Sequence, residues 1–178
     1  MNSKTIELPL SKIDARALRA GDLCLLSGPI YTLRDAGHVR LLEELGKASV
    51  LPYGLSGQTI FYAGPTPAKA DRPFGSIGPT TASRMDFATP LLLSRGLTAT
   101  IGKGERSEEV RQACKDYSSV YFIAVGGAAA FLAKHVESCE VLAYDDLGTE
   151  ALRRIVVRDF PVFVGIDTLG ESIYTLDR

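Results

Sequence analysis

The sequence predicts an α/β domain with a mixed sheet flanked by helices. In its second half, short apolar runs typical of buried strands alternate with segments typical of helices, which favours a sheet with parallel strands. The last two strand-like runs, 162–166 and 172–176, flank a turn over 167–170 and predict an antiparallel hairpin. We expect residues 1–178 to form a single domain, because this length and an apolar content of 46% suffice for one core.

The first half begins with residues 1–20, which we expect to form an N-terminal arm docked on the domain by Leu8, Leu10, Ile13 and Leu18. Two strand-like runs follow over 23–26 and 30–33, and Ser27-Gly28-Pro29 interrupts them. A helix is expected over 35–45, capped by its first residue, an aspartate, and ended by a glycine.

Residues 64–79 are unusual because they hold four prolines and three glycines with little periodicity. Such long loops inside a domain are usually functional. A strand over 58–63 precedes this loop, a short helix starts after it at about Thr80, and a further helix runs over 89–96. The remaining predicted elements are strands over 97–101, 120–125, 141–144 and 155–157, and helices over 107–117, 128–136 and 150–154.

Composition excludes several classes of protein. The net charge is −1 and no basic stretch stands out, so nucleic acid is a poor candidate partner. The apolar runs are too short to span a bilayer, and the N-terminus lacks the layout of a signal peptide, so we expect a cytoplasmic protein. Cys24, Cys114 and Cys139 are widely spaced without a C-x-x-C pair, so we predict no metal site in this chain and place Cys114 in the core.

The most informative segment is Gly78 to Asp86, which reads Gly-Pro-Thr-Thr-Ala-Ser-Arg-Met-Asp. Thr80 and Arg84 share one face of the helix predicted here, and Thr81 adds a second hydroxyl. Hydroxyls, a guanidinium and free N–H groups at a helix start form a corner that binds a carboxylate. The alternative is structural: a threonine caps the helix and Arg84 forms an ion pair within the protein.

A second candidate, Arg34-Asp35-Ala36-Gly37-His38, lies at a strand–helix junction. An arginine binds a carboxylate bidentately, and a histidine near its normal pKa transfers a proton. The alternative reading is a surface arginine, a capping aspartate and a solvated histidine.

Two glycine-flanked turns complete the candidates. Lys103 lies between Gly102 and Gly104 directly after a strand, where backbone can approach a ligand and the amine supplies a charge. Gly126-Gly127 ends a buried strand, which suits either an anion or close packing of a helix on the sheet. Three cations at strand–helix junctions suit a small dicarboxylate, yet no activated nucleophile, carboxylate pair or metal set accompanies them.

These segments resemble a known family. Gly78 to Asp86 is similar to the Gly-Pro-Thr-Thr-x-x-Arg-Met motif in the β subunit, or C-terminal domain, of iron–sulfur-dependent class I fumarases and L-tartrate dehydratases. Arg34-Asp35-x-x-His38, Gly102-Lys103-Gly104 and the closing segment 160–173 resemble further family segments in the same order. In the stretch 124–128 this chain has no cysteine, where some relatives carry one.

The resemblance implies a swivelling β/β/α domain that is the β subunit of a hydro-lyase. It implies an α subunit, in an α2β2-like hetero-oligomer, that holds a four-iron–four-sulfur cluster. By motif, Arg34, Arg84, Lys103 and Thr81 would bind substrate, Thr80 would be the candidate base, and His38 would be an acid/base or a support for Arg34. The implied reaction is hydration of fumarate to (S)-malate. Dehydration of tartrate to oxaloacetate, or a non-catalytic carboxylate-binding module, are the alternatives.

Overall fold

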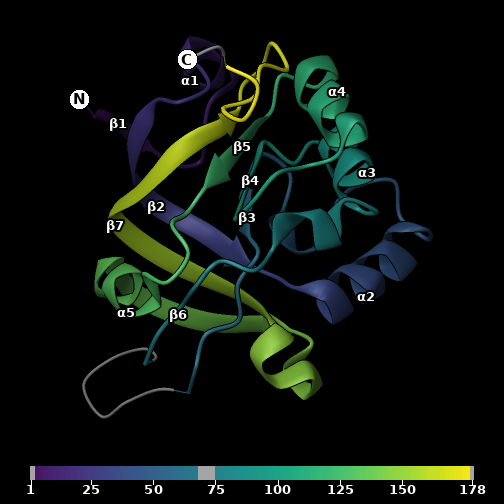
Figure 1. Cartoon of the computed structure of the whole chain (residues 1–178). Helices are drawn as coiled ribbons and strands as arrows, with labels where there is room; N and C mark the ends of the chain where they lie inside the picture. The colour runs from purple at the N-terminus through teal and green to yellow at the C-terminus, as the bar shows by residue number, and fades with distance from the viewer. Residues whose placement is uncertain (1–2, 68–74, 177–178) are drawn as a thin grey trace.

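Seven strands form one mixed sheet in the computed structural model, which describes residues 3–67 and 75–176. The strand order is β1-β2-β3-β4-β5-β7-β6, and β2 also pairs with β7, so β2, β3, β4, β5 and β7 close into a barrel-like ring (Figure 1). The strands are β1 (Lys4–Glu7), β2 (Leu23–Thr32), β3 (Thr59–Phe61), β4 (Ala99–Gly102), β5 (Val120–Ile123), β6 (Val136–Ala143) and β7 (Leu152–Ile166).

Strands β1 to β5 run parallel to their neighbours, whereas β7 runs antiparallel to β2, β5 and β6. This arrangement confirms the predicted mixed α/β fold. The α-helices are α1 (Lys12–Ala17), α2 (Asp35–Leu45), α3 (Thr89–Ser94), α4 (Glu108–Asp116) and α5 (Ala129–Leu132). Short 3-10 helices are η1 (Pro52–Gly54), η2 (Ala82–Met85), η3 (Ala133–His135) and η4 (Asp145–Glu150).

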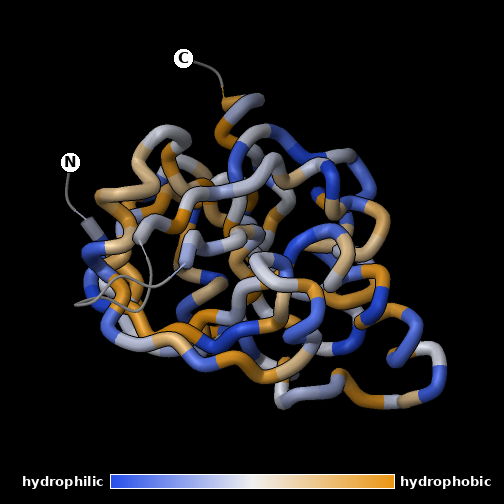
Figure 2. Tube along the Cα trace, turned by 90° about the horizontal axis from the view of Figure 1, so that it is seen from below, coloured by the Kyte–Doolittle hydropathy of each residue, from blue (hydrophilic) through white to orange (hydrophobic). Residues whose placement is uncertain are grey.

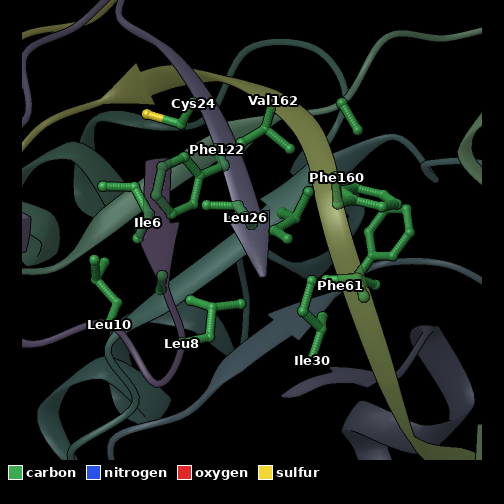
Figure 3. Close-up of a cluster of buried hydrophobic side chains, with 14 of the residues drawn as sticks. Ile6, Leu8, Leu10, Cys24, Leu26, Ile30, Phe61, Phe122, Phe160 and Val162 are labelled. Carbon is green, nitrogen blue, oxygen red and sulfur yellow. The ribbon is translucent and has the colours of Figure 1, made fainter. Parts of the chain in front are cut away.

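Side chains on the two faces of the ring build two cores. Inside the ring, Phe61, Phe122 and Phe160 pack with aliphatic residues from β1 and β2, and the rings of Phe61 and Phe160 meet edge to face at 5.5 Å (Figure 3). Outside it, Tyr62 and Tyr121 join the buried faces of α2, α3 and α4. Alternate residues of one strand therefore serve opposite cores, as the period of a strand requires.

Helices lie on opposite sides of the strands. Figure 1 shows α2, α3 and α4 on one side of the strands and α5 on the opposite side, next to β6. Hydrophobic and hydrophilic stretches alternate along the coloured part of the trace in Figure 2. Within the described part of the chain, no helix is both long enough and apolar enough to cross a membrane.

Helices α2 and α4 lie where they were predicted, but the cap of α2 differs. Ser107 caps α4 as expected, since its Oγ accepts from the N–H of Val110 at 3.4 Å. In α2 the N-cap position is Arg34 and not Asp35. The carboxylate of Glu150 takes over part of the capping, because its Oε2 accepts from the N–H of Ala36 at 2.8 Å.

The N-terminal residues are more integrated than the predicted arm. Residues 4–7 form β1, which pairs with 24–27 of β2 and so extends the sheet. Leu8, Leu10 and Leu18 are buried as expected, whereas Ile13 is 82% exposed. The two strand-like runs over 23–33 are one strand, because a bulge at Gly28 (φ 122°) absorbs the interruption.

Several predictions for the C-terminal third are wrong. Residues 150–154 are not a helix, and the pieces predicted from there to 166 are one 15-residue strand, β7. Strand β6 begins at Val136 rather than 141. Residues 172–176 form no second hairpin strand: they contribute a single bridge between Ile166 and Ser172.

Candidate functional site

The candidate site lies where parallel strands β2, β3 and β4 end. Arg34 follows β2, Tyr62 follows β3 and Lys103 follows β4. Because the three strands are parallel neighbours, their carboxyl ends share one edge of the sheet. This edge is where ligands bind in open α/β sheets, and here it carries residues from all three predicted segments.

Backbone hydrogen bonds attach Thr80 and its neighbours to this edge. The N–H of Thr80 donates to the carbonyl of Tyr62 at 2.6 Å, and the N–H of Lys103 donates to the carbonyl of Thr80 at 3.2 Å. The N–H of Ala82 in turn donates to the carbonyl of Lys103 at 2.9 Å. The hydroxyl-bearing segment and the Gly-Lys-Gly turn are therefore held side by side.

Gly102 makes this close approach possible. A Cβ at this position would lie 2.8 Å from Cβ of Ala82 and 3.0 Å from Cδ2 of Tyr62, both of which are buried. A residue with any side chain would push the segment off the end of β4. The glycine before Lys103 is thus explained by backbone approach within the protein.

Arg84 is held by a carboxylate of the protein itself. Its Nε donates to Oδ1 of Asp35 at 2.9 Å and its Nη2 donates to Oδ2 at 2.8 Å, a bidentate pair. The pair joins the two segments predicted to bind carboxylate. The predicted helix geometry is wrong in detail, because η2 is a 3-10 helix that begins at Ala82, so Thr80 precedes it.

The side chain of Arg34 lies over Gly64, which follows β3. A Cβ on Gly64 would lie 3.1 Å from both Cδ and Nη1 of Arg34. Glu150 is the acidic neighbour, with Oε1 3.7 Å from Nη2 of Arg34. Nε of Arg34 is buried and has no hydrogen-bond partner among the described residues.

Lys103 and Thr81 are exposed, and Thr80 is half-buried. The side chain of Lys103 passes Gly126, where an added Cβ would lie 3.7 Å from Cδ, an ordinary contact. Close packing of a helix therefore does not explain the Gly126-Gly127 pair. Gly127 instead has φ +80°, the left-handed region that favours glycine. Residues 68–74 of the predicted loop lie outside the described residues.

His38 is buried, which excludes the solvated histidine considered above. Its Nδ1 lies 2.8 Å from the carbonyl of Arg34, so Nδ1 carries the hydrogen and donates it. Burial lowers its pKa from 6.5 to about 4, against the opposing effect of the hydrogen bond to the Arg34 carbonyl. The imidazole is neutral at pH 7 and packs against the ring of Tyr62 at 5.3 Å.

A buried arginine, Arg106, was missed by sequence reasoning. Its guanidinium lies between the rings of Tyr62 and Tyr121, at 5.3 and 4.8 Å, and Nε donates to Oδ1 of Asp86 at 2.6 Å. Its Nη2 donates to Oγ1 of Thr89 at 2.7 Å. Asp86 closes the informative nonapeptide, but no local pattern links it to an arginine 20 residues later.

The cysteines do not fit an iron–sulfur cluster. Cys24 in β2 and Cys114 in α4 are buried, the latter as predicted, and Cys139 in β6 is half-buried. Across residues 3–67 and 75–176, no group of three or more His, Cys, Asp or Glu side chains could hold a metal ion. The candidate site holds cations and hydroxyls together with the carboxylates of Asp35 and Glu150, and its cations suit binding of a small anion.

The chain is similar to known proteins along most of its length. The family described as "Fumarase C-terminus" matches residues 2–176. The chain is 40% identical to "Fumarate hydratase class I, anaerobic" of Escherichia coli, over 84% of this chain and 28% of that protein. It is 35% identical to "Fumarate hydratase 2" of Leishmania major, over 96% of this chain and 31% of that protein.

A shorter relative is matched along most of its length. The "Putative L(+)-tartrate dehydratase subunit beta" of Methanocaldococcus jannaschii is 38% identical, over 93% of this chain and 88% of that protein. The chain thus spans less than a third of the two fumarate hydratases but most of this subunit. Its match along nearly the whole sequence establishes that the chain belongs to the fumarase C-terminus family.

Proposed function

We propose that this chain is the β subunit of a hydro-lyase that reversibly hydrates fumarate to (S)-malate. The observation that supports the proposal is that the segments carrying Arg34, Arg84, Lys103 and Thr80 lie together at one edge of the sheet. Guanidinium and ammonium groups can bind the two carboxylates of a small dianion, and hydroxyls can contact the remaining oxygen atoms. The names of the Escherichia coli and Leishmania major relatives support fumarate as the first choice.

A second polypeptide is part of this proposal. The relatives named fumarate hydratases are more than three times as long as the matched segment, whereas the relative named as a β subunit is of similar length. We therefore infer an α subunit that supplies the rest of the active site, in an α2β2-like assembly. The four-iron–four-sulfur cluster belongs to that subunit in our proposal, since the cysteines described here do not fit it.

The residues of this chain would bind and stabilise charge. Dehydration of malate removes a proton from the carbon beside a carboxylate, and negative charge spreads onto that carboxylate. A fixed guanidinium or ammonium group next to it lowers the energy of that transition state. We assign Arg34, Arg84 and Lys103 to the two carboxylates, with Thr81 at their side, and propose Thr80 as the base that takes the proton from the adjacent carbon.

His38 supports the backbone of Arg34 in this proposal. It is buried and neutral, and its Nδ1–H is directed at the backbone carbonyl of Arg34. Of the two roles expected for it, acid/base or support for Arg34, this geometry favours support.

Tartrate dehydration to oxaloacetate is the second candidate, and the similar length of the tartrate dehydratase subunit relative favours it.

An anaerobic assay of the complex between this chain and its α subunit tests both candidate reactions. We expect conversion of fumarate and (S)-malate by the complex and none by this chain alone. Conversion of a tartrate instead would select the second candidate. If an iron-loaded complex converts none of these acids, the chain is a carboxylate-binding module, and calorimetry with (S)-malate would then detect binding.

A further inference from the structure

Asp35 binds Arg84 and does not cap helix α2, although it is the first residue of that helix. An aspartate at the start of a helix usually caps it, yet the N–H of Ala36 is bound by Glu150 instead. Both carboxylate oxygens of Asp35 accept from Arg84, at 2.8 and 2.9 Å. The carboxylate of Asp35 is therefore committed to one guanidinium group, and a distant glutamate performs the capping.

We propose that Asp35 is the positioning residue of Arg84 and fixes the direction in which its guanidinium meets a substrate carboxylate. The inference rests on the proposed function. Asp35 occupies the edge of Arg84 formed by Nε and Nη2, which leaves Nη1 and the outer hydrogen of Nη2 for a ligand. A planar group held along one edge can present the other edge in one orientation.

Arg84 needs such support because of the element that carries it. It lies on η2, a 3-10 helix of four residues, and its side chain is half exposed, so several rotamers are open to it. Asp35 belongs to α2, a helix of 11 residues whose other face is buried against the outer core. The pair therefore attaches the half-exposed side chain of Arg84 to helix α2. This attachment reduces the conformational entropy that Arg84 loses when a ligand binds.

The opposite role for Asp35 predicts the opposite result. If its carboxylate competed with substrate for Arg84, removal of its charge would strengthen substrate binding. If it orients Arg84, removal would weaken binding. The sign of the change in KM thus decides between the two.

The test compares Asp35→Asn with Asp146→Asn in the complex with the α subunit. Asp146 is a matched control, because it forms a bidentate pair with Arg40 of the same helix at 2.7 and 2.9 Å. We expect Asp35→Asn to raise the KM for the dicarboxylate about tenfold or more, with a smaller change in kcat, and Asp146→Asn to leave both within about twofold. Exposed pairs contribute little stability, so the two variants should have similar melting temperatures.

A second readout shows whether Asp35 acts through Arg84. In an Arg84→Ala background, Asp35→Asn should cause no further loss, because the group it orients is gone. An unchanged or lowered KM in Asp35→Asn, or a full further loss in the double variant, would overturn the inference. If the wild-type complex is inactive, the proposed function fails. The Kd for (S)-malate is then compared between Asp35→Asn and Asp146→Asn. Equal Kd values for the two variants, or no detectable binding by either, would overturn the inference.

Discussion

At the scale of single residues, the site consists of cations that other side chains hold in place. Arg84 is paired with Asp35, Arg34 lies near Glu150, and the carbonyl of Arg34 accepts from His38. The sequence placed these cations at strand–helix junctions and offered an ion pair of Arg84 as the alternative, which the structure shows, but it did not identify the carboxylates beside the arginines. A carboxylate such as Glu150, more than a hundred positions from its arginine, leaves no local signal.

The buried imidazole of His38 makes stability depend on pH. Its pKa is about 4 in the folded chain, below the ordinary value of 6.5, so between these values the unfolded chain binds a proton that the folded chain does not. The free energy of unfolding therefore falls as pH decreases from about 6.5 to 4, by about 3 kcal/mol from this group.

Urea unfolding at pH 7 and pH 4 measures this effect. His38→Asn keeps a donor for the Arg34 carbonyl and removes the titrating ring, so we expect a smaller difference between the two pH values. A full wild-type difference in His38→Asn would contradict the buried, neutral imidazole.

At the scale of elements, the site depends on how closely η2 approaches the end of β4. The contact between Gly102 and Ala82 sets that distance, and Arg106 fixes the far end of the segment through Asp86. Both interactions join residues that are at least 20 positions apart. Local pattern therefore predicted the strand and the short helix, but not the distance between them.

Gly102→Ala should destabilise the protein. Its Cβ would meet two buried neighbours that cannot move freely, at a cost of about 1–3 kcal/mol, which lowers Tm by roughly 2–10 °C. Gly46→Ala is the control, because Gly46 has helical φ and ψ and an added Cβ would make ordinary contacts. Calorimetric scans should show Tm near wild type for the control. Equal Tm values for all three proteins would contradict the close approach.

At the scale of the whole molecule, prediction succeeded where signals are local and failed where pairing is long-range. Helices α2 and α4 have clear periodicity and end signals, and both lie where expected. Sequence reasoning divided strand β7 into a helix over 150–154 and two strands over 155–157 and 162–166. It is continuous because β2 pairs with it over 153–163, while β6 pairs with 152–157 and β5 with 163–166.

The same contrast applies to the candidate site. Alternation of strands and helices placed Arg34, Thr80 and Lys103 at strand–helix junctions, and the structure brings these segments together at one edge of the sheet. The sequence could not show that His38 is buried or that Arg84 is already paired. Both follow from tertiary contacts between α2, β3 and η2.

The central claim is that this edge binds a carboxylate of the substrate, and Arg84→Ala in the complex with the α subunit tests it most directly. We predict that kcat/KM falls roughly 30-fold to a few thousandfold, because one substrate charge loses its partner. This fall corresponds to a loss of about 2–5 kcal/mol of transition-state stabilisation. Arg40→Ala, which removes the other bidentate arginine pair of α2, should remain near wild type. A kcat/KM for Arg84→Ala equal to that of Arg40→Ala would contradict the account.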